Sequence, residues 1–107
     1  MLPDPAPAFR ALSDPTRREI LSLLMGDEMT IAQVADQFDM TRPAVKKHLS
    51  RLADAQLISV EPRGRERINR LNPEGFRAVS TWLDLFDRYW DEKLTKLKDT
   101  IERDTAK

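Results

Sequence analysis

The sequence predicts a mainly α-helical protein with a small β-hairpin, folded as a winged helix-turn-helix. Three observations support this fold class. Two segments with helical apolar spacing, residues 31–38 and 42–52, flank a three-residue turn; two β-branched segments, LISVEP and ERINRL, follow; and only three of 107 residues are glycine, as in helix-rich domains. We expect a single domain over residues 1–107, with a core over 8–72 and a dimerisation helix over 73–103.

Two helices are expected at the start of the chain. Prolines at positions 3, 5 and 7 indicate a poorly ordered arm over the first seven residues, leading into a short helix over about 8–12. Ser13 or Asp14 can cap the next helix, and Pro15 fits its first turn, where a missing N–H group costs nothing. The turn GDEM ends this helix, whose broad apolar face consists of Ile20, Leu21, Leu23 and Leu24.

The helix-turn-helix pair follows. Thr30 is the expected N-cap of the helix in TIAQVADQF, and Thr41 can cap the second helix, with Pro43 in its first turn. In this second helix Val45, Leu49 and Leu52 share one arc at roughly 100° per residue, so they form the buried stripe. The opposite face carries Pro43, Lys47 and Ser50, flanked by Arg42, Lys46 and Arg51.

Positive charge is concentrated in the middle of a chain whose net charge is zero. Residues 42–70 contain eight basic and three acidic side chains, a net charge of +5, whereas residues 1–41 carry −4 and residues 71–107 carry −1. Such a basic segment is the electrostatic signature of a surface that binds a polyanion. An ordinary solvated helix face is the alternative for the helical cations.

A hairpin is expected after Ala55. LISVEP and ERINRL are short and rich in β-branched residues, and a turn through Arg63, Gly64 and Arg65 joins them. Arg63, Arg65 and Arg67 would then lie at or near the tip. The hairpin is a candidate wing whose guanidinium groups reach phosphates or a narrow minor groove, and a plain polar turn is the alternative.

The last predicted helix is long and carries an apolar stripe. Asn72 can cap it ahead of Pro73, and apolar residues follow at three- and four-residue steps. This surface is too large for one edge of so small a domain, so we expect it to pack against a second subunit. A small-molecule pocket between helices is the alternative for the aromatic residues Trp82, Phe86, Tyr89 and Trp90.

Three blocks of the sequence together resemble the ArsR-type winged-helix transcriptional regulators. These are FRALSDPTRREILSLL, TRPAVKKHLSRLADAQLI and PRGRERINRL, and the similarity covers about residues 8–72. The aromatic last helix is more similar to the non-metal, SdpR-like branch. The resemblance implies a homodimeric repressor of an operator near its own gene, held together by its first and last helices. The implied interface residues are Phe9, Leu83, Phe86, Trp90, Leu94 and Leu97.

The resemblance also implies double-stranded DNA as the partner, with two recognition helices in successive major grooves and the wings over the flanking backbone. His48 is either packed or in contact with a phosphate, and the resemblance favours the second. Lys46 departs from the small hydroxyl residue frequent in the family, and can donate to phosphate or guanine. The candidate DNA-binding residues are Thr41, Arg42, Lys46, Lys47, His48, Ser50, Arg51, Arg63, Arg65 and Arg67.

The sites of the metal-sensing members are not represented in this sequence. TIAQVADQF contains neither thiol nor imidazole, the chain has no cysteine, and Asp84, Asp87 and Asp91 have no histidine beside them. Zinc and similar metals prefer nitrogen or sulfur ligands, so we expect no metal and no cofactor. The inducer would be an unidentified small molecule or partner protein, or the regulator would respond only to its own concentration.

Other functional classes fit less well. The single histidine lies far from any plausible nucleophile, and no glycine-rich phosphate loop is present, so we do not expect an enzyme. No apolar run is long enough for a membrane span, and MLPDPAPAF lacks the pattern of a secretory signal, so a cytoplasmic protein is expected. The competing hypothesis is a winged helix that binds another protein instead of DNA.

Overall fold

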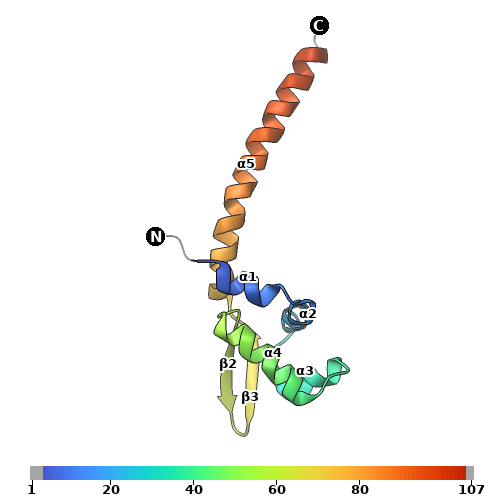
Figure 1. Cartoon of the computed structure of the whole chain (residues 1–107), viewed down its shortest axis with the longest axis vertical. Coiled ribbons are helices and arrows are strands. Elements are labelled where there is room, and N and C mark those ends of the chain that lie inside the picture. The colour runs from blue at the N-terminus through green and yellow to red at the C-terminus, as the bar shows by residue number, and fades with distance from the viewer. Residues whose placement is uncertain (1–3, 106–107) are drawn as a thin grey trace.

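The computed structural model describes residues 4–105 and confirms the winged helix-turn-helix fold (Figure 1). Part of the predicted N-terminal arm, residues 1–3, lies outside the described residues. The elements in order are α1 (Ala6–Leu12), α2 (Pro15–Leu24), β1 (Met29–Thr30), α3 (Ile31–Gln37), α4 (Arg42–Asp54), β2 (Ile58–Arg63), β3 (Glu66–Leu71) and α5 (Pro73–Thr105).

The helices begin where the sequence supplies caps. Of the two candidates for α2, Asp14 is the N-cap, and its carboxylate accepts a hydrogen bond from the Arg17 backbone N–H. Thr30 forms a reciprocal capping box with Gln33 at the start of α3, and the Thr41 hydroxyl caps α4 through the Ala44 N–H. Helix α1 begins at position 6, earlier than expected, so the predicted arm over the first seven residues was too long.

One apolar core joins the helices to the hairpin. The side chains of Ile20, Val34, Val45, Leu52 and Leu57 are fully shielded from solvent. They come from α2, α3, α4 and the loop before β2, so the buried stripe of α4 packs against the two preceding helices. This packing fixes the orientation of α4, and the opposite face of the helix is left to solvent.

The sheet has three antiparallel strands in the order β1-β3-β2, with Ile58 opposite Leu71 and Arg63 opposite Glu66. The short strand β1 was not predicted; the Asn69 side chain donates a hydrogen bond of 3.1 Å to the Met29 carbonyl beside it. Gly64 has a φ of 65° in the two-residue turn between β2 and β3, a conformation that favours glycine. The predicted hairpin turn is therefore confirmed.

Helix α5 leaves the core and projects into solvent (Figure 1). The Asn72 side chain caps it by accepting a hydrogen bond from the Glu74 N–H. Its 33 residues account for most of the molecule's longest dimension, 72 Å, because each residue adds about 1.5 Å. Within residues 4–105, no helix has both the length and the apolar character needed to cross a membrane.

Candidate nucleic-acid interface

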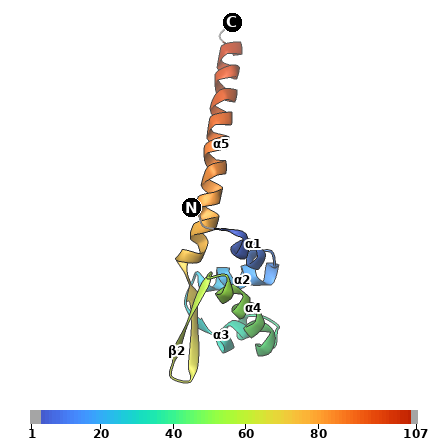
Figure 2. The same ribbon diagram turned by 60° about the vertical axis from the view of Figure 1, so that its left-hand side comes forward.

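The helix-turn-helix and the wing lie at one end of the molecule. Figure 2 shows α3, α4 and the hairpin together at the end opposite the free part of α5. The outward face of α4 is exposed as expected, with Arg42, Lys46, Lys47 and Ser50 all open to solvent. Arg65 and Arg67 are exposed on the hairpin. Helix and wing therefore present cations to the same side of the core.

These cations surround a common hollow. A cavity of about 390 Å³ lies between the start of α3, the start of α4 and the tip of the wing. Arg42 and Lys46 line it from α4, and Arg65 and Arg67 line it from the hairpin, with Glu66 as the single carboxylate in the lining. Cationic side chains that converge from several elements form a suitable site for a backbone phosphate. Sequence reasoning identified the four cations but not that they share one hollow.

Two arginines of the basic segment are neutralised by carboxylates. Arg63 Nη1 lies 3.0 Å from Glu28 Oε1, and Arg63 Nη2 lies 3.3 Å from Glu61 Oε2. The hydrogen bond to Glu28 raises the pKa of Arg63 above its usual value, so the guanidinium stays charged and paired. Arg70 also contacts Glu28 and Glu61. Glu28 lies 35 residues before Arg63, and nothing in the local sequence indicates this pairing.

His48 faces the interior of the helix-turn-helix. Its Nδ1 atom lies 3.8 Å from Asp14 Oδ2, and the side chain keeps only 21% of its exposure. This nitrogen is buried and has no hydrogen-bond partner among the described residues. The Nδ1 edge of His48 therefore packs between α4 and the start of α2, and His48 is not among the residues that line the hollow.

Arg51 lies on the other flank of α4 from the wing. Five residues separate it from Lys46, which corresponds to about 140° around the helix. It lines a second hollow with Arg10 and Arg17 rather than the one beside the wing. The predicted cationic face of α4 is thus divided between two flanks.

The predicted interface residues are solvent-exposed in the single chain. Phe9 is 38% exposed, and Trp90 and Leu94 are 56% and 58% exposed. Leu83, Phe86 and Leu97 are exposed to similar degrees. Phe9 of α1 also contacts Trp82 of α5 edge to face, with ring centroids 5.3 Å apart, so α1 and the base of α5 form one continuous apolar surface.

The carboxylates of the last helix do not converge. Among residues 4–105, no group of three or more histidine, cysteine or acidic side chains is arranged to hold a metal ion.

Comparisons with known proteins place this geometry in a family. Residues 12–61 match the sequence profile of a helix-turn-helix domain. The chain is 36% identical to the HTH-type transcriptional regulator Rv2034 of Mycobacterium tuberculosis over 92% of this chain and 89% of that protein. It is also 36% identical to the transcriptional repressor SdpR of Bacillus subtilis, over 80% of this chain and 96% of SdpR.

A solved structure agrees. The crystal structure of an ArsR family transcriptional regulator superimposes with a TM-score of 0.73 at 36% identity, covering 80% of this chain and 94% of that one. The predicted resemblance, including its SdpR-like character, is confirmed. The chain therefore belongs to the ArsR family of winged helix-turn-helix proteins and is a DNA-binding transcriptional regulator.

Proposed function

We propose that the protein is a homodimeric repressor that binds a pseudo-palindromic operator, including one near its own gene. The hollow lined by Arg42, Lys46, Arg65 and Arg67 carries this proposal, because cations from the recognition helix and from the wing converge there on one shared space. Base edges would be read by the outward face of α4, where Lys47 and Ser50 are exposed. Thr41 would contribute by capping the helix that enters the major groove.

The apolar stripe of α5 supports a second copy of the chain as the partner of this helix. Six exposed apolar side chains follow one another at three- and four-residue steps, and at 44–58% exposure they leave a large apolar surface in water: Leu83, Phe86, Trp90, Leu94, Leu97 and Ile101. Such continuous surfaces on a soluble chain mark contacts with another protein. Phe9 would extend the interface from α1.

The charges of α5 favour an antiparallel pair of helices. Residues 84–92 contain four acidic side chains and one basic one, whereas residues 93–98 contain three lysines and no acid. A parallel pair would place like charges beside each other along both segments, while an antiparallel pair sets acidic against basic. If the two helices cross near position 92, 19 residues of α5 precede the crossing in each subunit, so the starts of the two α5 helices would lie about 57 Å apart. Half-sites more than one helical turn of DNA apart are therefore expected.

Fluorescence anisotropy with labelled DNA from just upstream of the gene tests the proposal. Binding that survives an excess of scrambled DNA is the expected result. Binding that scrambled DNA abolishes would contradict a specific operator at this locus. Absence of any binding at low salt would support the alternative of a winged helix that binds another protein through α5.

Paired variants connect the result to the proposed contacts. Lys47→Ala and Arg65→Ala should each weaken binding at least about tenfold while leaving the fold and oligomeric state unchanged, because charge-assisted contacts to DNA are lost. Arg70→Ala is the matched control, since Arg70 is already paired with Glu28 and Glu61. Equal losses in all three variants would show that only overall charge matters, and would count against these two contacts.

The signal that releases the repressor would act on the dimer. A small molecule or a partner protein would act by changing the dimer geometry, because the distance between the two α4 helices sets which half-site spacing can be bound.

A further inference from the structure

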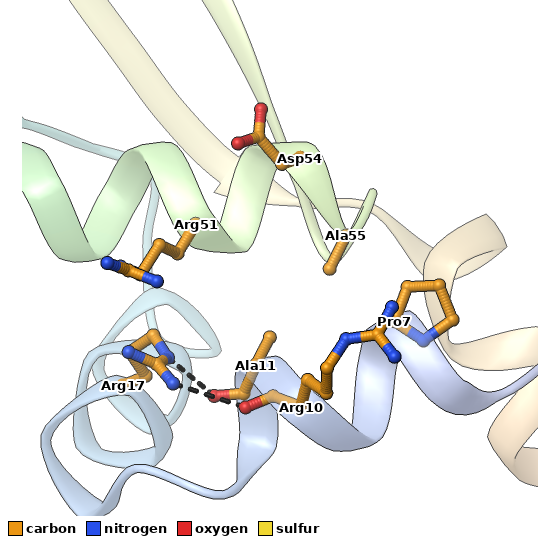
Figure 3. A pocket seen from close by; sticks show the side chains of 7 residues that line it. All are labelled: Pro7, Arg10, Ala11, Arg17, Arg51, Asp54 and Ala55. Carbon is orange, nitrogen blue, oxygen red and sulfur yellow. Dashed lines mark hydrogen bonds between the residues drawn. The ribbon is translucent and has the colours of Figure 1, made fainter.

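A second cationic hollow lies on the flank of α4 that faces away from the wing. It has a volume of about 430 Å³ and is formed by α1, the start of α2 and the C-terminal half of α4. Three arginines from three different helices line it: Arg10, Arg17 and Arg51. Figure 3 shows the side chains of Arg17 and Arg51 on the same side of this space. None of the residues that line the hollow beside the wing belongs to this second hollow.

Arg17 is held in place by the end of α1. Its Nε donates a hydrogen bond of 2.6 Å to the Ala11 carbonyl, and its Nη2 donates one of 3.1 Å to the Arg10 carbonyl (Figure 3). The side chain is half-buried. Its position is therefore fixed before any ligand arrives, and Nη1 makes no hydrogen bond within the described residues. A donor that is already ordered loses little entropy when it binds an anion.

The arginines of this hollow form no ion pair within 4.0 Å among residues 4–105, and Asp14, the carboxylate whose pKa is lowered by the Arg17 backbone N–H and by the charge of Arg17, is not part of the lining. Arg63 and Arg70 are paired with Glu28 and Glu61. By contrast, Arg10, Arg17 and Arg51 form no such ion pair within the described residues. Asp54 belongs to the lining, yet its carboxylate points away from Arg17 and Arg51 in Figure 3. Guanidinium groups that line one hollow repel each other, and an anion bound between them would reduce the repulsion.

We propose that this hollow binds a phosphate-type anion between Arg17 and Arg51. Guanidinium groups suit this ligand because their N–H donors match the spacing of phosphate oxygens. The phosphate can be a free anion or part of the DNA backbone on the second side of the major groove, and the latter source rests on the proposed function. In either case the anion connects α4 to α2, and the hydrogen bonds of Arg17 extend this connection to the end of α1. Phe9 of α1 in turn contacts Trp82 of α5.

The test uses the full chain and the variant Arg51→Gln. Arg51 makes no hydrogen bond within the described residues, so its loss should leave the fold intact, whereas Arg17→Gln would also remove two hydrogen bonds that end α1. Arg88→Gln, on exposed helix α5, is the matched control. Circular dichroism of each variant checks the fold.

The first arm titrates the DNA-free protein with inorganic phosphate, at an ionic strength held constant with chloride, and follows the arginine side-chain Nε signals by NMR. A free-anion site predicts a saturable shift of the Arg17 signal, weakened about tenfold in Arg51→Gln and unchanged in Arg88→Gln. The second arm measures how DNA affinity depends on salt. A backbone-phosphate site predicts that Arg51→Gln makes the slope of log K against log salt concentration less negative by about 2 for the dimer. The control variant should leave this slope unchanged.

Either result supports the anion site and identifies its source. The proposal is overturned if phosphate causes no saturable shift and the salt slope of Arg51→Gln equals that of the unsubstituted protein. If the unsubstituted protein binds no DNA, the proposed function fails, and the phosphate titration alone then decides whether the hollow is an anion site.

Discussion

Single residues in this protein act mainly by closing the ends of helices and by fitting close backbone approaches. Asp14 caps α2 and also lies beside His48, so one carboxylate connects the start of α2 to the middle of α4. Gly75 lies where α5 passes directly over the backbone at Gln56. Both residues serve the contact between helices rather than DNA itself.

The cap at Asp14 predicts a pH-dependent stability. Its pKa is lowered, first by the hydrogen bond from the Arg17 backbone N–H and further by the nearby charges of Arg17 and His48. A lowered folded-state pKa means that the carboxylate stabilises the fold above the ordinary carboxyl range and stops doing so as pH falls through the folded value. Asp14→Ala should therefore be less stable than the unsubstituted protein at about pH 7, with a smaller difference at about pH 3.

Urea unfolding at equal protein concentration measures both differences. Asp36→Ala is the control, because it removes an exposed carboxylate that caps no helix. A difference for Asp14→Ala that stayed constant with pH would contradict the ionised cap.

Gly75 predicts a strong steric effect. A Cβ atom at this position would lie 1.9 Å from the Gln56 carbonyl oxygen, which is backbone and cannot move independently. Gly75→Ala should destabilise the protein by about 3 kcal/mol because α5 must shift away from the core. Gly26→Ala is the control, since its Cβ would meet only the Leu23 oxygen at 3.5 Å. Thermal unfolding of both variants tests this prediction. Similar melting temperatures for the two variants would refute the close approach of Gly75 to the Gln56 backbone.

At the scale of elements, α5 is the part that the single chain leaves incomplete. The other helices bury an apolar face in the core, but in α5 only Ala78 is buried among the described residues. A helix of this length gains most of its stability from tertiary packing, so its exposed stripe requires a partner. The proposed partner is the same helix of a second subunit in the opposite direction.

A single cysteine at the end of α5 can measure this direction. The chain has no cysteine of its own, so Thr105→Cys gives one spin label per subunit. If the antiparallel helices cross near position 92, the two labels should be at least about 40 Å apart, because 13 residues of helix extend from the crossing on each side. Parallel helices would place them within about 10 Å of each other. Pulsed electron paramagnetic resonance distinguishes these distances.

Trp90→Ala in the same background provides the second half of this test. Removing a large exposed ring from the centre of the stripe should shift the protein toward monomer, and the interspin distance should disappear on dilution. If sedimentation at low concentration is the same with and without Trp90, this face is not the dimer interface.

At the scale of the whole molecule, the basic segment 42–70 lies at one end of the long axis, beside the helices α1, α2 and α3 of the acidic segment 1–41 (Figure 2). The cations of α4 and the wing lie at one end, and α5 projects from the other (Figure 2). The zero net charge of the chain therefore says little about the field at the DNA-binding end. Within this end, Arg63 and Arg70 are already paired with carboxylates, so fewer cations are free for phosphates than the sequence count suggests.

This distribution predicts a steep salt dependence. If each subunit neutralises four phosphates, the slope of log K against log salt concentration for the dimer should be about −7. Anisotropy titrations at several salt concentrations measure the slope directly. A slope near zero would refute the electrostatic basis of binding, because the salt dependence arises from counterions that are released when cations neutralise phosphates.

The sequence by itself determined the helices, their caps and the hairpin. Asp14, Thr30 and Thr41 lie within three residues of the N–H groups that they cap, and the apolar spacing that defines each helix repeats within one or two turns. These interactions are local, so they can be read along the chain. The resemblance to the ArsR family was read from the same local segments, and the similarity to known regulators confirmed it.

Only the tertiary structure decided which cations are free and which are paired. Glu28 forms an ion pair with Arg63 from 35 residues away, Asp14 approaches His48 from another helix, and Arg17 and Arg51 line one hollow. Strand β1 forms only because β3 lies next to Met29 and Thr30. Each of these contacts depends on how the core brings distant segments together, and no pattern within a short stretch of sequence encodes that packing.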